Sequence, residues 1–119
     1  MEEKDIRILG RSFQFALRIV KVVQQLPDDK GVKVLANQLL RAGTSVGANV
    51  EEAIAACSKR DFIHTMNIAL KEARETHYWL RLLEGSDMVK ASRLSAIIAE
   101  SEEIKKILGA IVRTSRKSI

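Results

Sequence analysis

The chain has 119 residues and a net charge of +5, with an isoelectric point near 9.6, so it suits one domain with a single core and favours acidic or phosphate-bearing partners. Aromatic residues make up only 4% and there is one proline, a composition that favours an all-α fold. A single cysteine excludes an internal disulfide, and neither an 18-residue apolar run nor a signal-like N-terminus is present, so we expect a cytoplasmic protein without a membrane partner.

The first predicted helix covers residues 5–25 and ends at a turn-forming segment, LPDDKG. Two apolar lines run along this helix, and together they are wider than one helix of an isolated bundle needs. Either the core is broad, or apolar surface is left for another subunit; we favour self-association. The line that we expect in the core is Leu9, Phe13, Ala16, Val20 and Val23. The second line is Phe15, Ile19, Val22 and Leu26.

The second predicted helix covers residues 32–57, because apolar residues recur at helical spacing as far as Cys57, which we expect to be a small core residue. Inside it, Gly43 and Gly47 each cost about 1 kcal/mol relative to alanine. They lie four residues apart, so we expect them to share one side of the helix and to let another backbone pack closely. A neighbouring side is polar and consists of Gln38, Arg41, Ser45, Asn49 and Glu52.

The third predicted helix covers residues 59–84, with Ser58 as its N-cap and Gly85 as the left-handed residue that ends it. The fourth covers residues 88–113. No linker or repeat interrupts the series, so residues 1–119 form one predicted domain. Four amphipathic helices joined by short turns predict an up-down-up-down antiparallel four-helix bundle.

A second line on the third helix places Glu72 and Glu75 between apolar residues and Trp79. Adjacent antiparallel helices would bring Arg41 to one of these carboxylates in charge-assisted hydrogen bonds. Desolvation can exceed the attraction in such pairs, so we predict that they set the register of the helices rather than their stability. The predicted structural network comprises Arg41, Ser45, Asn49, Glu52, Glu72, Glu75 and Trp79.

Catalytic and metal chemistry find no support in the sequence. A di-iron bundle needs Glu-x-x-His pairs, whereas Asp61 precedes His64 and Arg74 precedes His77 at that spacing. Cys57 and the histidines show no spacing that argues for a catalytic dyad, and no phosphate-binding glycine loop is present. We therefore expect no enzyme activity, no cofactor and no metal.

The positive charge is concentrated near the C-terminus, where residues 86–119 carry seven basic and four acidic side chains. Two explanations stay open: contact with phosphates, or cations that complement the dipole of the last helix. The candidate nucleic-acid-binding residues are Lys105, Lys106, Arg113, Arg116 and Lys117.

Two ordered motifs, LLRAGTSVGANVEEA and DFIHTMNIALKEARETHYWLRLLE, resemble the four-helix-bundle proteins encoded by intervening sequences within bacterial 23S ribosomal RNA genes. Related bundles include the accessory variability determinant of retroelements. The resemblance implies a non-enzymatic homopentamer with a role in binding RNA or DNA. The positions that it carries over are Arg41, Ser45, Asn49 and Glu52, followed by Lys71, Glu72, Glu75, Tyr78 and Trp79.

Two functional hypotheses follow from the sequence. The first is an oligomer that binds RNA or DNA through its basic surface, with affinity that falls steeply with salt. The second is a protein-interaction scaffold, or an adaptor for an RNA-processing enzyme or a reverse transcriptase. Such an adaptor would not bind RNA and would retain a protein partner.

Overall fold

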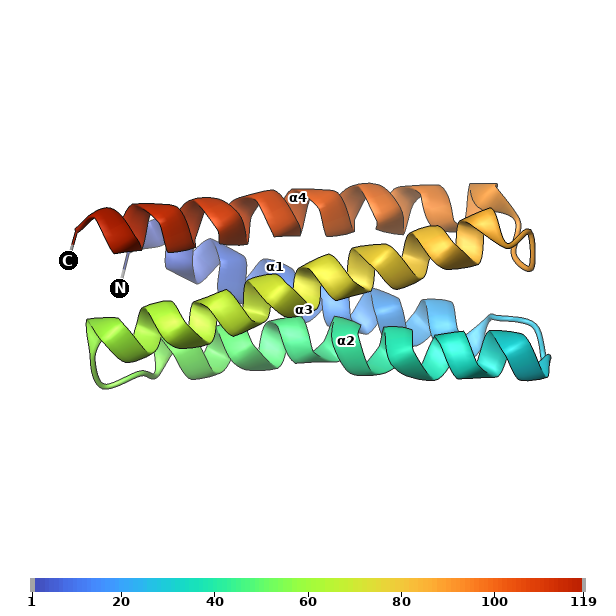
Figure 1. Cartoon of the computed structure of the whole chain (residues 1–119), viewed down its shortest axis with the longest axis horizontal. Coiled ribbons are helices and arrows are strands. Elements are labelled where there is room, and N and C mark those ends of the chain that lie inside the picture. The colour runs from blue at the N-terminus through green and yellow to red at the C-terminus, as the bar shows by residue number, and fades with distance from the viewer. Residues whose placement is uncertain (1, 119) are drawn as a thin grey trace.

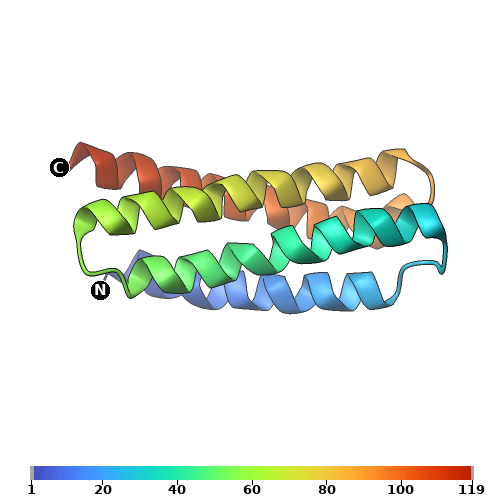
Figure 2. The same ribbon diagram turned by 60° about the horizontal axis from the view of Figure 1, so that its bottom comes forward.

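Four helices account for most of residues 2–118, which are the residues described by this computed structural model. They are α1 (Glu3–Gln24), α2 (Lys30–Ile54), α3 (Lys59–Gly85) and α4 (Ala91–Lys117). The α1–α2 and α3–α4 loops lie at one end of the molecule, and the α2–α3 loop lies at the other (Figures 1 and 2). No strand occurs within the described residues, so the predicted all-α class is confirmed.

The helix boundaries follow capping interactions. The Asp29 side chain accepts a hydrogen bond from the Val32 N–H at 3.1 Å, and Ser58 accepts one from Asp61 at the same distance, which confirms Ser58 as the N-cap of α3. The expected left-handed cap at Gly85 is wrong, since no glycine in residues 2–118 has a positive φ. Asp87 adopts that conformation instead, with φ of 60°.

The predicted limits of α2 and α4 also need correction. α4 begins at Ala91 and continues to Lys117, rather than covering residues 88–113. α2 ends at Ile54, which leaves Cys57 exposed in the loop that follows, so Cys57 is not the core residue that we expected. Neither glycine nor proline follows Ile54 to mark the end of the helix, so the apolar spacing alone extended the predicted helix as far as Cys57.

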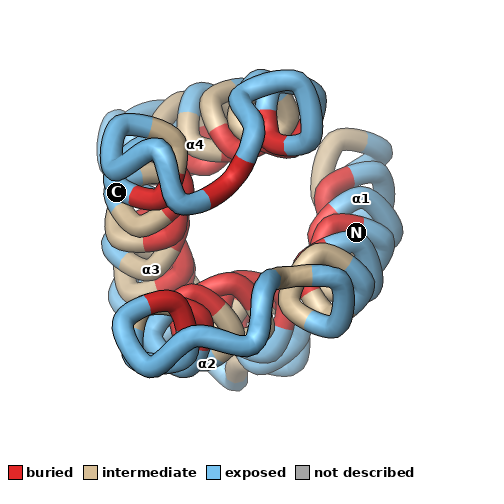
Figure 3. The backbone as a smooth tube through the Cα atoms, turned by 90° about the vertical axis from the view of Figure 1, so that its right-hand side faces the viewer, coloured by how far each residue is buried: buried red, intermediate tan, exposed pale blue. Residues whose placement is uncertain are grey.

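The core lies between the four helices, whose buried positions face the middle of the bundle (Figure 3). Each helix packs beside the next in the chain, and α1 also contacts α4, although less extensively. Aliphatic side chains fill most of this space. The largest fully buried residues include Phe15, Ile19, Leu39, Met66, Leu80, Leu83, Leu94, Ile104 and Leu108.

The second apolar line of α1 is buried more deeply than the line expected in the core, although Leu9 and Val23 of that expected line also pack against the core. Phe15 and Ile19 are fully buried, whereas Phe13, from the line expected inside, is 55% exposed. The two lines are equally apolar and equally spaced, so periodicity could not choose between them. The packing of α1 on α2 makes the choice. It leaves an exposed apolar stripe on α1, defined here as Ile6, Phe13 and Leu17.

Candidate nucleic-acid interface

A groove of about 450 Å³ lies between α3 and α4, towards the C-terminal end of α4. Four of its eight lining residues are cations, and none is a carboxylate. We call it the basic groove. Its lining residues are Asn67, Leu70, Arg74, Gly109, Val112, Arg113, Arg116 and Lys117.

Helical periodicity brings these residues together. Asn67, Leu70 and Arg74 follow the i, i+3, i+7 spacing of one face of α3, and the α4 residues follow the same rule from Gly109 onwards. Leu70 and Val112 are buried, whereas the arginine side chains on either side are exposed. The groove therefore has an apolar floor and a cationic rim.

The cations of the basic groove are not neutralised within the described chain. Every ion pair found in residues 2–118 involves other basic side chains, namely Lys4, Arg11, Lys33, Arg41, His77 and Lys105. Positive charge that has no carboxylate beside it is available to an anionic partner.

Beyond Arg74 and Gly109, the same α3–α4 face carries a paired cluster. Glu102 lies 2.9 Å from the Lys105 ammonium and 3.2 Å from His77 Nε2. A hydrogen bond from Lys105 holds the pKa of Glu102 below its usual value. Burial lowers the pKa of His77, and Lys105 adds to that shift while Glu102 opposes it. Because these charges are already paired, they attract a polyanion less strongly than the cations of the basic groove do.

The five C-terminal cations singled out from the sequence thus have different surroundings. Arg113, Arg116 and Lys117 line the basic groove. Lys105 is already paired with Glu102, and Lys106 is exposed outside the groove lining. Sequence reasoning missed Arg74, Asn67 and Leu70, which come from α3. The sequence did contain a sign of them, because this face of α3 carries one cation and no acidic residue. That sign becomes informative only when this face is known to lie beside the end of α4.

A second polar constellation joins α2 to α3. The Arg41 guanidinium forms ion pairs with Glu75 and, at 3.3 Å, with Glu72, and it also donates to the Gln38 side chain at 3.2 Å. Trp79 Nε1 donates to Glu75 at 3.0 Å. We call these five residues the Arg41 cluster. The Arg41 side chain is 48% exposed and that of Glu72 16%, so water screens the pairs and their contribution to stability is small.

The other members of the predicted polar network do not reach α3. Ser45 donates to the Arg41 carbonyl at 2.7 Å, and Asn49 donates to the Ser45 carbonyl at 2.8 Å, so both side chains bond to their own helix. Glu52 is exposed and forms no ion pair within residues 2–118. The interhelical contacts of the network therefore reduce to the Arg41 cluster.

Gly43 and Gly47 face α1. A Cβ atom at Gly43 would lie 2.9 Å from Ile19 side-chain carbons, and one at Gly47 would lie 3.2 Å from the Ser12 carbonyl oxygen. The missing side chains thus give α1 room beside α2, in the arrangement that their spacing predicts. Their helix-propensity cost has a packing explanation.

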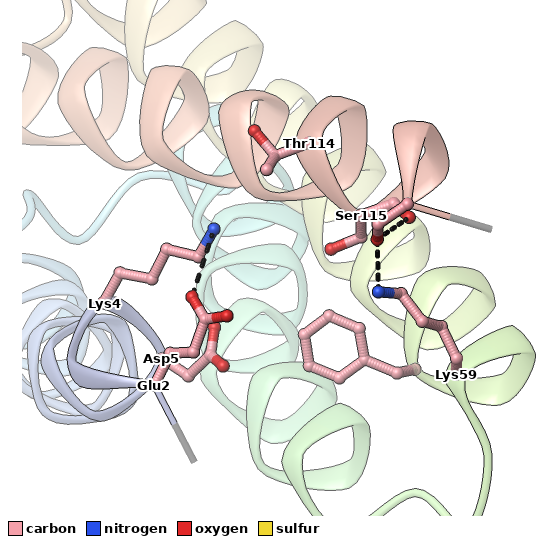
Figure 4. A pocket seen from close by; sticks show the side chains of 8 residues that line it. Glu2, Lys4, Asp5, Lys59, Thr114 and Ser115 are labelled. Carbon is pink, nitrogen blue, oxygen red and sulfur yellow. Dashed lines mark hydrogen bonds and ion pairs between the residues drawn. The ribbon is translucent and has the colours of Figure 1, made fainter.

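A smaller pocket of about 240 Å³ lies at the end of the bundle where α1, α3 and α4 meet (Figure 4). Its two lysines already have partners, because Lys4 lies 3.5 Å from Glu2 and Lys59 donates to Ser118. Asp5 adds a further carboxylate to the lining. This pocket has mixed charge, so it is a weaker candidate for an anion than the basic groove.

The described residues also bear on metal binding and membrane insertion. No group of three or more histidine, cysteine or acidic side chains within residues 2–118 is placed to hold a metal ion. In the same span, no helix is both long and apolar enough to cross a membrane.

The comparisons with known proteins identify the family. The model of the 23S rRNA-intervening sequence protein family matches residues 4–110. The chain belongs to this family. A crystal structure from Bacteroides thetaiotaomicron, described as a protein of unknown function from the S23 ribosomal protein family, is similar to it with 43% identity and a TM-score of 0.85. The alignment covers 92% of this chain and 98% of that one.

Among curated proteins, none shows significant similarity to the chain. The resemblance seen in the sequence is confirmed by the family match. The matched segment ends before Arg113, Arg116 and Lys117, which supply most of the positive charge of the basic groove. Family membership therefore leaves the role of the groove to be argued from its own chemistry.

Proposed function

We propose that this family member is a non-enzymatic protein that binds RNA or DNA through phosphate contacts at the basic groove. The observation that carries the proposal is the set of four cations, Arg74, Arg113, Arg116 and Lys117, in a groove without a lining carboxylate. Arginine offers several N–H donors in one plane to phosphate oxygens, and the released counterions favour binding entropically. The affinity is then electrostatic and largely independent of base sequence.

We also propose that the up-down-up-down bundle acts as a homo-oligomer, with a homopentamer implied by the family resemblance. The apolar stripe on α1 supports association, since Phe13 is 55% and Ile6 54% exposed. Several copies of a weak site on one particle would bind a long polyanion with avidity. Each copy contributes a net charge of +5.

The test is a binding titration between the full chain and a fluorescent 30-nucleotide single strand. It is repeated at several salt concentrations between about 50 and 200 mM, because affinity that depends on phosphate contacts falls steeply over this range. Wild-type affinity should fall linearly on a log–log plot. Arg113→Glu with Arg116→Glu should weaken binding about a hundredfold at the lowest salt, because two attractions become repulsions.

The matched control reverses two cations at the other end of α4. Lys90 and Arg93 are exposed, lie outside the groove and form no ion pair within residues 2–118, so Lys90→Glu with Arg93→Glu changes the net charge equally. The control should keep most of the affinity. Equal losses of affinity in both variants would show that binding depends on overall charge. A wild-type affinity that does not change with salt concentration would refute the proposal.

A scaffold or adaptor for an RNA-processing enzyme or a reverse transcriptase is the second candidate. It is favoured by the same apolar stripe on α1, which another protein could cover. Sedimentation of Phe13→Ser separates the two uses of the stripe. A fall in oligomer mass assigns the stripe to self-association, whereas an unchanged mass, together with no nucleic-acid binding by the wild type, favours the adaptor.

A further inference from the structure

Gly109 differs from the glycines of α2. A Cβ atom added at Gly109 would meet no atom within 4 Å, so no neighbouring helix requires its absence. An interior helical glycine costs about 1 kcal/mol relative to alanine. Gly109 lines the basic groove together with Leu70 and Val112, and its lack of a side chain leaves this part of the groove open.

The floor has chemistry that phosphates do not use. Phosphate oxygens accept hydrogen bonds and gain nothing from the apolar edges of Leu70 and Val112. Asn67, the only neutral polar side chain in the lining, can both donate and accept, as the edge of a nucleobase does. The lining therefore offers more than a phosphate site needs.

We propose that the basic groove binds an unpaired nucleobase of single-stranded nucleic acid. The base lies over Gly109 and stacks on an arginine guanidinium, as bases do in many single-strand-binding proteins. Asn67 contacts the edge of the base, while the flanking phosphates lie against the other cations of the rim. This inference rests on the proposed function and adds a preference for single strands.

The dimensions of the groove fit this ligand. Its volume of about 450 Å³ is within the range of sites that hold small organic molecules. A paired base has its hydrogen-bonding edge occupied and both faces stacked. A duplex can therefore contact the cationic rim, but its bases cannot reach the floor of the groove. The floor thus distinguishes single strands from duplexes, and the rim does not.

The experiment compares three 15-nucleotide probes by fluorescence anisotropy with the full chain: oligouridylate, an abasic strand with the same backbone, and a blunt duplex. The wild type should bind oligouridylate about tenfold more tightly than the abasic strand, as expected for a stacked base. Gly109→Leu should bring the affinity for oligouridylate down to that for the abasic strand, since leucine occupies the floor. Affinity for the abasic strand should fall far less than affinity for oligouridylate.

Gly85→Leu is the matched control. A Cβ atom added at Gly85 would also meet nothing within 4 Å, but Gly85 ends α3 far from the groove, so the base preference should persist. Leucine is a better helix former than glycine, so both variants should fold, which thermal melts verify. The same comparison with oligodeoxythymidylate distinguishes DNA from RNA, and base-dependent binding of either supports the inference.

Three outcomes would overturn the inference. Equal wild-type affinity for oligouridylate and the abasic strand would mean that no base enters the groove, and tighter binding of the duplex than of oligouridylate would remove the preference for single strands. An unchanged base preference in Gly109→Leu would place the base elsewhere. In these cases phosphate binding still stands, whereas failure of all three probes to bind at low salt would remove the proposed function as well.

Discussion

The α2–α3 and α3–α4 interfaces of the bundle use arginine in opposite ways. Between α2 and α3, Arg41 pairs with Glu72 and Glu75 across the helices. Between α3 and α4, the arginines of the basic groove line a surface without a carboxylate. A paired guanidinium links two helices and has little charge left for a partner, whereas an unpaired one adds little to the fold and remains available to an anion.

Pairing, rather than the number of cations, identifies the candidate interface. Of the C-terminal cations, Lys105 lies 2.9 Å from Glu102 and resembles Arg41, while Arg113 and Arg116 lie in the groove. A count of charge along the sequence treats them alike.

Gly109→Glu should pair cations of the basic groove with a carboxylate, as Arg41 is paired between α2 and α3. The new side chain would start in space where its Cβ atom meets no other atom within 4 Å, and its carboxylate would lie among the four cations of the groove. Nucleic-acid affinity should fall about tenfold, since one attraction is cancelled at close range. The melting temperature should rise, because glutamate is a better helix former than glycine and gains ion pairs.

Gly109→Gln is the control for Gly109→Glu, since it adds the same bulk without charge. Anisotropy titrations with an abasic strand isolate the charge effect, because that probe does not depend on the open floor. If the glutamine variant lost as much affinity for this probe as the glutamate variant, bulk rather than pairing would explain the effect.

Arg41→Met should affect the fold and leave nucleic-acid binding unchanged. Removing the guanidinium leaves Glu72 and Glu75 close together without their cation, at a cost of about 1 kcal/mol given the exposure of the pair. If the Arg41 cluster sets helix register, amide NMR signals should also broaden or multiply. Urea unfolding and a two-dimensional NMR spectrum measure the two effects.

Arg81→Met serves as the control for Arg41→Met, because Arg81 is exposed on α3 and forms no ion pair within residues 2–118. It should change neither stability nor spectra appreciably. Sharp, single signals and native assembly in Arg41→Met would show that the Arg41 cluster does not determine register.

The sequence predicted the four helices because each carries a long amphipathic repeat, and it predicted that Arg41 could reach Glu72 or Glu75 because those residues lie on regular helical lines. It could not choose the buried face of α1, since Phe13 and Phe15 lie on lines of equal apolar character. Only the packing of α1 against α2, beside Gly43 and Gly47, distinguishes them.

The basic groove was only half accessible from the sequence. Its α4 cations formed a visible cluster near the C-terminus, but the predicted helix limit of residue 113 left Arg116 and Lys117 outside the last helix. Arg74 was missed because a site built from two helices depends on their relative positions. Local pattern carries no such information until the neighbours of each helix are known.

Arg11 and Glu100 join α1 to α4, because the Arg11 guanidinium donates two hydrogen bonds of 2.9 and 2.8 Å to the Glu100 carboxylate. The hydrogen bonds from Arg11 lower the pKa of Glu100, so this pair stabilises the fold above the ordinary glutamate pKa of about 4.3. That stability is lost as the pH falls through the lower pKa of the folded protein.

The contribution of this pair should be only a few tenths of a kcal/mol, because both side chains are partly exposed. Glu100→Gln should therefore lower the free energy of unfolding slightly at pH 7 and by less at pH 2.5, where more of the Glu100 carboxyl is protonated, as measured by urea titration. An equal deficit at both pH values would mean that the ionised pair is not the cause. The basic groove has no lining carboxylate, so its affinity for an abasic strand should not follow the acid-side loss of stability that the Arg11–Glu100 pair produces.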